Sequence, residues 1–519
     1  MAKTSNLIIA RNMKPDRQYI NVLSLSDSAM LAAVNANAAA TATNYSFIRE
    51  ERNTIKVSLS YSTCITCNYM AFQNPDYSNK WFFAWIDSVE YVGENTVRIR
   101  FTVDIWSTWH NAMNWQPVFV EREHVLDDTF GIHTLPEPVK TDLMISQHVN
   151  NRYWTSFSII VFFTKSQISS ADVGYDIDHR YCSPCQVKRY SCNQTGIGQI
   201  QADLADGGSL ANANIISMNV MPTALIPANQ QDQNNIAETA STEYDVSMVL
   251  PISLDGYVPV NRKCFLHPYN FISVNNGNLE KIYKYEKFTN INTSQAVFTI
   301  TGGILPNGAA TLYPQDYDGR TGSNVAESLS IGDFPMIIYP IDSYAAWLAQ
   351  KSGGTVVQGI MSTLTGALAG GLKGGAVGAA IGAGAGLLGG VTNYIAQEES
   401  ARSEKDHVTG TNNINIDMIK NLMGYSFCQK SAVADDAERI DRFFSQFGYN
   451  VSTVKIPNYT GRTYWNYVKI NGSAGYGALP ESARDEINNI LNKGTTIWHN
   501  HTDMGNYFAG GVKMQNPIL

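Results

Sequence analysis

The feature that most constrains this chain is a long apolar segment, interrupted by glycine, near its middle. Residues 366–390 read GALAGGLKGGAVGAAIGAGAGLLGG, and between residues 352 and 397 the only charged side chain is Lys373. Glycine returns at every fourth position: Gly366, Gly370, Gly374, Gly378, Gly382, Gly386 and Gly390. As a helix, this stretch is about 37 Å long. It is therefore long enough to cross a hydrocarbon core of about 30 Å.

The glycine spacing predicts different behaviour in water and in lipid. On a helix it forms a flat stripe against which neighbouring membrane helices pack closely. The remaining large aliphatic side chains are Leu364, Leu368, Leu372, Val377, Ile381, Leu387 and Leu388. In water each glycine costs a helix interior about 0.8–1 kcal/mol relative to alanine, whereas lipid enforces a helix because unpaired backbone groups cannot reach water. We expect an irregular segment in water and a regular one in lipid or against copies of itself.

Other interpretations of this segment stay open from its residues alone. The pattern also fits a glycine-zipper helix in a protein core, or a flexible loop buried in an oligomer. A permanent transmembrane helix is a third interpretation, although the sequence shows no second span and no signal peptide. A conditional membrane segment is the hypothesis that we carry forward.

The charge balance excludes one class of function. The chain has 37 Lys and Arg against 45 Asp and Glu, for a net charge of -8, and no block of basic residues. Because phosphate contacts need clustered Lys and Arg, we expect no tight or sequence-specific binding of nucleic acid. The N-terminal stretch lacks the pattern of a signal peptide, so we expect synthesis in a cytoplasm. Seven cysteines among 519 residues is a low, odd count, so we expect no disulfide framework. The length predicts two to four domains.

Period-two alternation predicts strands over much of the chain. The stretch 79–109 is expected to form a β-hairpin closed by VGEN, with Val97, Ile99, Phe101, Val103 and Ile105 on one face. Helices are expected within 435–451, which opens with acidic residues, and within 478–494, which has proline near its start and glycine at its end. The alanine-rich stretch 27–42 is a further helix candidate.

Cysteine pairs with metal-type or redox-type spacing occur twice. Cys64 and Cys67 fall in a predicted strand, where positions i and i+3 point to opposite faces. A second group lies in one loop: His179, Cys182, Cys185 and Cys192. A zinc site there is an alternative, but we interpret these cysteines as small hydrophobic residues or free thiols.

Three polar clusters are weighed as sites and interpreted as structural. His499, His501 and Asp503 alternate, so a strand would place them on one face as metal ligands. Asp176 and Asp178 are expected in a surface loop. Another cluster is Glu121, Arg122, Glu123 and His124, which lacks the two-His spacing of zinc proteases and is expected to form ion pairs with neighbouring subunits. We therefore expect no catalytic residue, no metal site and no cofactor.

Four longer stretches carry a family resemblance. Residues 74–109 read NPDYSNKWFFAWIDSVEYVGENTVRIRFTVDIWSTW, and residues 119–142 read FVEREHVLDDTFGIHTLPEPVKTD. Residues 439–472 read RIDRFFSQFGYNVSTVKIPNYTGRTYWNYVKING, and GTTIWHN follows at 494–500. These motifs resemble the tail knob (distal tail tube) proteins of short-tailed phages of the phi29 type, with matched blocks over about residues 44–145 and 415–505.

The resemblance implies a mainly β fold with some α, in which the N- and C-terminal parts build a β-rich, tube-forming scaffold. It divides the chain into an N-terminal tube-wall β domain (1–144) and an inserted, β-rich distal knob region (145–327). A long, glycine-rich, hydrophobic, membrane-active loop (328–400) and a C-terminal tube-wall domain (401–519) follow. The membrane-active residues are then the aliphatic and glycine positions named above.

The same resemblance implies a location, partners and an action. The expected protein is a homo-hexamer in the virion that contacts other tail proteins, such as the upper collar or tail tube and the tail tip. Its loops plug the lumen and on infection insert into host cytoplasmic membrane lipids, forming a channel for genome ejection. Viral DNA would pass through the lumen without specific binding. Two alternatives place a cell-wall-degrading site or a receptor-binding adhesin within residues 145–300.

Overall fold

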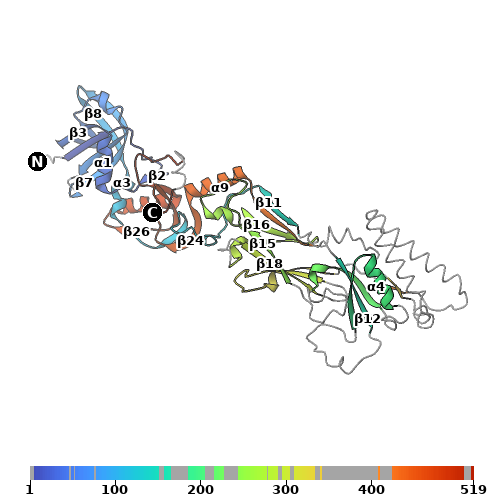
Figure 1. Ribbon diagram of the computed structural model, residues 1–519. Coiled ribbons are helices and arrows are strands. Elements are labelled where there is room, and N and C mark those ends of the chain that lie inside the picture. Colours follow the sequence, from blue (N-terminus) through green and yellow to red (C-terminus); the bar gives the residue numbers. More distant parts are fainter. Residues whose placement is uncertain are drawn as a thin grey trace. The chain divides into compact units, whose positions relative to one another are not determined.

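The structure is a computed structural model of the chain. It describes residues 5–45, 48–51, 53–74, 77–150, 157–164, 185–204, 215–226, 243–277, 279–289, 295–303, 309–332, 339–341, 407–409, 424–507 and 516–519. Contacts divide the chain into two compact units. Figure 1 shows their elements, coloured along the sequence. Unit 1 comprises residues 1–142, 253–265 and 432–519, and unit 2 comprises residues 143–252 and 266–431. Residues 253–265, which the sequence-based division places in the middle region, pack with unit 1.

Unit 1 is built on two main sheets. The first has the strand order β3 (Ala38–Tyr45), β1 (Ser5–Ala10), β6 (Tyr69–Asn74), β7 (Lys80–Gly93), β8 (Thr96–Val103), β5 (Thr54–Val57) and β4 (Ile48–Glu51). The second has the order β2 (Asn21–Leu23), β27 (Thr495–Trp498), β25 (Trp465–Asn471), β10 (Val118–Glu123) and β24 (Tyr449–Lys455). A small sheet joins β26 (Gly475–Gly477) to β9 (Met113–Trp115). Because the second sheet interleaves strands from both ends of the chain, neither end can form it alone.

Short helices pack on these sheets. They are α1 (Asp27–Ala36), α2 (Tyr61–Cys64), α3 (Ile105–Trp109), η2 (His110–Ala112), α9 (Ala434–Phe447) and α10 (Glu481–Lys493). The two C-terminal helices confirm the sequence expectation, with Asp435 and Asp436 in the first turn of α9 and Gly494 at the C-cap of α10. Acidic residues in a first turn complement the helix dipole.

The core of unit 1 is shared between the N- and C-terminal parts. Trp465 and Trp498 of the C-terminal strands are 1% and 0% exposed and pack with Ile8, Met13 and Trp85 of the N-terminal part. The indole of Trp498 also donates to Oδ1 of Asn21 at 2.8 Å. In Figure 1 the C-terminal strands lie beside the N-terminal elements α3 and β2. Full burial of large aromatic side chains contributes several kcal/mol, so the two ends stabilise each other.

Unit 2 contains several smaller sheets. One sheet has the order β11 (Leu143–Asn150), β23 (Ser426–Ala432), β16 (Asn270–Asn275) and β17 (Glu280–Tyr283), and a second has the order β13 (Cys185–Ser191), β12 (Phe157–Thr164) and β14 (Ile215–Pro222). A third has the order β15 (Glu243–Val249), β18 (Gln295–Gly303), β19 (Ala309–Pro314) and β20 (Leu329–Gly332). The fourth pairs β21 (Tyr339–Ile341) with β22 (His407–Thr409). The described helices within its bounds are α4 (Gln194–Leu204), η5 (Thr223–Leu225), η8 (Tyr285–Lys287) and η10 (Val325–Glu327). The fold is mainly β, as the sequence predicts.

The β7–β8 hairpin forms as predicted, but its second strand ends earlier than expected. The hairpin β7–β8 is confirmed, with Val97, Ile99 and Phe101 buried. However, β8 ends at Val103, and Ile105 begins α3, because the carboxylate of Asp104 accepts from the backbone N–H of Ser107 at 3.1 Å and caps that helix.

The alanine-rich stretch is only half helical. Helix α1 ends at Ala36, and Ala38–Tyr45 forms β3, which pairs antiparallel with β1. Pairing with a buried neighbouring strand outweighs the helix propensity of alanine here.

Gly448 sits at a position that only glycine can occupy. It follows α9 with φ of 64° and ψ of -153°, a region of backbone space that side chains exclude. A Cβ there would lie 2.1 Å from the carbonyl oxygen of Glu123 on β10. The close approach of these two backbones therefore depends on the missing side chain.

We predict that Gly448→Ala lowers the free energy of unfolding of unit 1 by more than about 2 kcal/mol, because strain and overlap add. Gly505→Ala is the matched control: Gly505 has φ of 80° but its Cβ would meet nothing within 4 Å, so about 1 kcal/mol is expected. Urea denaturation monitored by tryptophan fluorescence measures both. Equal effects of the two substitutions would contradict the close approach.

Candidate functional site

The predicted membrane-active residues lie outside the described residues. The whole set from Leu364 to Gly390 falls between residues 342 and 406, which the structure does not describe. Among the residues that it does describe, no helix is both long enough and apolar enough to cross a membrane. The conditional membrane segment therefore stays a prediction from the sequence.

The metal sites that the sequence offers as alternatives do not form among the described residues. Strand β27 ends at Trp498, so His499, His501 and Asp503 do not alternate on a strand. His499 instead bonds Asn466 at 3.0 Å, and within the described ranges no three His, Cys, Asp or Glu side chains are grouped to hold an ion. His179, Cys182, Asp176 and Asp178 lie outside the described residues.

Five of the cysteines are free thiols: Cys64, Cys67, Cys192, Cys264 and Cys428. Cys64 ends the short helix α2 and Cys67 follows it, so the predicted strand is wrong there; Ser60 caps this helix by accepting from the N–H of Thr63 at 3.3 Å. Both thiols are buried in the apolar core behind the first sheet. Burial raises the pKa of the Cys64 thiol to about 11. They act as small hydrophobic residues, as the sequence predicts.

The polar cluster 121–124 forms ion pairs, but inside the chain. Glu121 binds Lys469 at 2.5 Å and Glu123 binds Lys455 at 2.5 Å, while Arg122 binds Glu137. Each of these partners lies in the same chain and the same unit, and pairing with neighbouring subunits stays a prediction. These ion pairs connect β10 to the neighbouring strands β25 and β24 and to the loop that follows β10.

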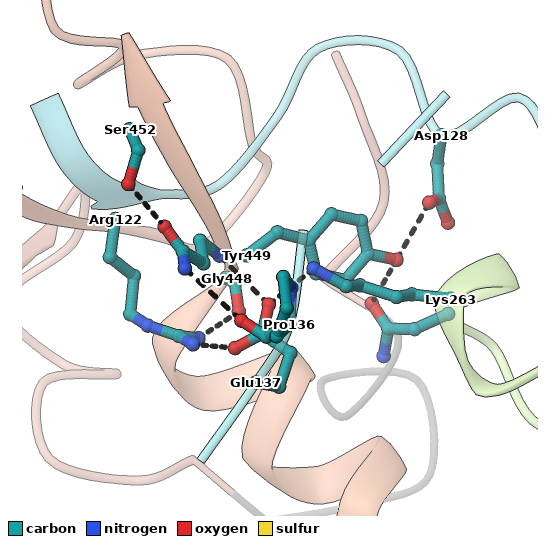
Figure 2. A network of polar contacts seen from close by, with 10 residues as sticks. Arg122, Asp128, Pro136, Glu137, Lys263, Gly448, Tyr449 and Ser452 are labelled. Atoms are coloured by element: carbon teal, nitrogen blue, oxygen red, sulfur yellow. Dashed lines mark hydrogen bonds and ion pairs between the residues drawn. The ribbon is translucent and has the colours of Figure 1, made fainter. Parts of the chain in front are cut away.

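A buried polar site not foreseen from the sequence lies beside α9. Its central group is the carboxylate of Glu137, whose side chain is 1% exposed. It pairs with Arg122 and with Lys263, and it accepts from the backbone N–H of Asn450 at 2.9 Å. Figure 2 shows these groups converging from three segments that are distant in the sequence. A buried carboxylate is tolerated only with such partners.

Aromatic rings surround the two cations of this site. The guanidinium of Arg122 lies 4.9 Å from the ring centre of Phe443, and the ammonium of Lys263 lies 5.2 Å from that of Tyr449. Burial, with the positive charge of Arg122, lowers the pKa of Lys263 to about 7, while the ion pair with Glu137 favours its protonated form. We call the ion pairs of Glu137 with Arg122 and Lys263 the electrostatic joint. The joint positions neither a nucleophile nor a leaving group.

Asp441 on α9 provides a second buried carboxylate. Its side chain accepts from the Tyr257 hydroxyl at 2.8 Å and from the backbone N–H groups of Val260 at 3.0 Å and Asn261 at 2.9 Å. The side-chain amide of Asn261 adds a bond at 2.8 Å. The N-terminus of the same helix is capped by Asp255, which accepts from the N–H of Ala434 at 3.1 Å. Helix α9 thus holds residues 253–265 in unit 1.

A third carboxylate, Asp128, completes the site. It accepts from the hydroxyl of Tyr449 at 2.6 Å and from the N–H of Arg262 at 3.0 Å (Figure 2 shows the bond with Tyr449). Burial raises the pKa of Asp128. We call Asp128, Glu137 and Asp441 the three anchoring carboxylates.

His124, which directly follows β10, is buried. Its Nδ1 accepts from the N–H of Tyr467 at 2.7 Å, so Nε2 carries the proton and donates to the carbonyl of Ser445 at 3.0 Å. Burial, with the positive charge of Arg462, lowers the pKa of His124 to about 3. It is therefore a neutral structural bridge between β10, β25 and α9 at neutral pH.

An apolar hollow opens on the surface of unit 1. It has a volume of about 350 Å3, and its lining includes Leu126, Ile132, Leu135, Glu123 and Asp127. Both carboxylates in the lining are engaged in structural bonds, that of Glu123 with Lys455 and that of Asp127 with the N–H and hydroxyl of Thr129. The hollow therefore shows no carboxylate free for acid–base chemistry among the described residues.

Comparison with known proteins agrees with this picture. The family described as Caudoviral major tail protein N-terminus matches residues 3–114. In fold, the chain is similar to the tail knob protein gp12 of bacteriophage C1, with a TM-score of 0.63 and 11% identity over 99% of this chain and 100% of that one. Fold and matches define the class: a structural protein of a phage tail, carried in the virion.

The remaining matches are more specific. The family described as Bacillus phage phi29, Tail knob protein gp9, C-terminal domain, matches residues 226–510. The chain belongs to this tail knob family. The tail knob proteins gp9 of Bacillus phages PZA and phi29 are 23% and 22% identical to it, each over 88% of this chain and 90% of the relative. These relatives are named as structural tail proteins rather than enzymes, so the wall-degrading alternative is not supported.

We predict that Glu137→Gln destabilises unit 1 by about 3–5 kcal/mol, because it leaves two buried cations without their carboxylate. Glu121→Gln is the control, since its pair with Lys469 is 34% and 40% exposed and such pairs contribute about 0–1 kcal/mol. Urea titrations of the two variants give the comparison. A loss of less than about 1 kcal/mol in Glu137→Gln would show that the joint does not hold unit 1.

We predict that unit 1 loses stability in acid through His124. The folded pKa of about 3 lies below the ordinary value of about 6.5, so the contribution is complete above pH 6.5 and is lost as pH falls toward 3. The slope is at most about 1.4 kcal/mol per pH unit. His124→Gln should flatten the fall in unfolding free energy between pH 6.5 and 4, whereas the exposed His148→Gln should not. An unchanged slope in His124→Gln would refute the assignment.

Proposed function

We propose that this chain forms the hexameric distal tail tube of a short-tailed phage and carries a plug that becomes a membrane channel. The hydrophobic segments around residues 352–397, one from each subunit, fill the lumen before infection. On infection they leave the lumen, insert into the host cytoplasmic membrane and line a path for genome ejection. The observation that carries the proposal is one charged side chain, Lys373, in 46 residues of a tail knob protein.

The physical reason for a plug is the size of this apolar surface. A free patch of such extent on a soluble protein promotes aggregation, so it needs shielding until use. Packing of six copies in a lumen gives that shielding, and lipid replaces it afterwards at about 25 cal/mol per Å2 of apolar area. The glycine stripe would let neighbouring helices pack closely around a pore.

The charge pattern supports passage of DNA without specific binding. Basic side chains lining a lumen would bind phosphates and slow the transit of DNA. This chain has an excess of 8 acidic residues over basic ones and no basic block. The other proposed partners are the upper collar or tail tube above the knob and the tail tip below it.

We predict that Leu368→Asp combined with Ile381→Asp abolishes leakage of dye from liposomes by the full-length protein at micromolar concentration. Each charge near the centre of a membrane helix costs about 2.5–3.5 kcal/mol. Ser403→Asp with Thr411→Asp is the control, because it adds the same charge outside the apolar run. Leakage is measured by dequenching of an encapsulated dye at neutral and acidic pH.

Two results would contradict the proposal. One is leakage by the Leu368→Asp, Ile381→Asp protein equal to that of the unaltered chain. The other is intact dye in the presence of both the unaltered full-length chain and a peptide of residues 352–397.

A further inference from the structure

Residues 253–265, which we call the strap, are attached to unit 1 without a strand ladder. The chain is described throughout 243–277, and between β15 and β16 it contains η7 (Arg262–Phe265) and no strand. An isolated bridge between Leu254 and Tyr257 lies within the strap itself. The strap therefore differs from the strands of unit 1, which share ladders with neighbours on the sheets.

The three anchoring carboxylates hold the strap. Asp441 accepts from the backbone of Val260 and Asn261, Asp128 accepts from the backbone of Arg262, and Glu137 pairs with Lys263. All three carboxylates belong to segments outside the strap. Bonds of backbone N–H to a carboxylate are stronger than neutral ones, but each depends on one side chain.

The apolar contact of the strap covers one face only. Leu254, Cys264 and Phe265 are 0%, 0% and 3% exposed, whereas Val258 and Val260 are 65% and 43% exposed. Lifting the strap therefore exposes a few side chains and leaves the cores of the two main sheets intact. Segments with this character open locally at a lower free energy than the whole fold.

We propose that the strap is a latch, which detaches from unit 1 as a local unit while the two main sheets of that unit stay folded. The chain runs directly from both ends of the strap into unit 2, at residues 252 and 266. Opening the latch frees the chain at both of these crossings. The latch does not depend on membrane insertion, so the two proposals stand or fall separately.

The strap contains its own reporter. The thiol of Cys264 is fully buried beside Asp441, with Sγ 3.6 Å from Oδ1, and burial raises its pKa well above the ordinary range. It reacts with an alkylating reagent only when the strap opens. Cys64, fully buried in the first-sheet core of the same unit, reacts only when that core opens.

The test is peptide-resolved thiol labelling of the full-length chain with iodoacetamide at fixed pH, read by mass spectrometry in increasing urea. In the unaltered protein we expect Cys264 to label faster than Cys64 and with a weaker dependence on urea, as local opening exposes little surface. Asp441→Asn and Glu137→Gln should raise the Cys264 rate roughly tenfold or more at low urea, and in both folded variants Cys264 should still label faster than Cys64 and with the weaker dependence on urea. Asp435→Asn, an exposed substitution on the same helix, should change neither rate.

The outcome that overturns the latch is a common rate. If Cys264 and Cys64 label together with the same urea dependence in the unaltered protein, the strap opens only with the whole unit. Unchanged protection of Cys264 in a folded Asp441→Asn or Glu137→Gln protein would also overturn it. If either variant fails to fold, the other variant and the urea dependence of the unaltered chain still decide.

Discussion

The joint burial of tryptophans from the two ends of the chain is the interaction on which unit 1 depends. Trp465 and Trp498 come from the C-terminal strands, yet their neighbours Ile8 and Trp85 come from the N-terminal part. The parallel pairing of β2 with β27 has the same consequence. Because large aromatic side chains dominate core energetics, neither end has a complete core alone. The middle of the chain is therefore an insertion into a scaffold that its two ends close.

An insertion of this kind needs secure points where the chain leaves and re-enters the scaffold. The three anchoring carboxylates lie at such points: Asp128 and Glu137 precede the first crossing, and Asp441 follows the last. All three bind the strap between the crossings. Buried charges are costly unless they are paired. The three carboxylates therefore favour the one chain arrangement that pairs them, at the points where the scaffold meets the insertion. The polar network serves structure, which agrees with a tail protein that performs no chemistry.

The sequence predicts local structure well and long-range polar contacts poorly. The β7–β8 hairpin and helices α9 and α10 follow from period-two alternation, acidic first turns and terminal glycine, all of which are local signals. The end of β8 at Val103 and the strand β3 were not predicted, because the Asp104 cap of α3 decided the first and pairing with β1 decided the second. No sequence pattern indicates that Glu137 and Lys263 interact, since their contact exists only after folding. Asp441 does carry a sequence signal, because it is a charged residue on the buried face of α9 beside Ile440 and Phe444.

Negative-stain electron microscopy of two purified proteins, the full-length chain and a chain lacking residues 352–397, tests the lumen plug most directly. We expect six-fold rings from both proteins, with density on the axis in the full-length ring and an open centre in the shortened one. Rings with identical centres, or a shortened chain that no longer forms rings, would contradict a lumen plug carried by a self-sufficient scaffold.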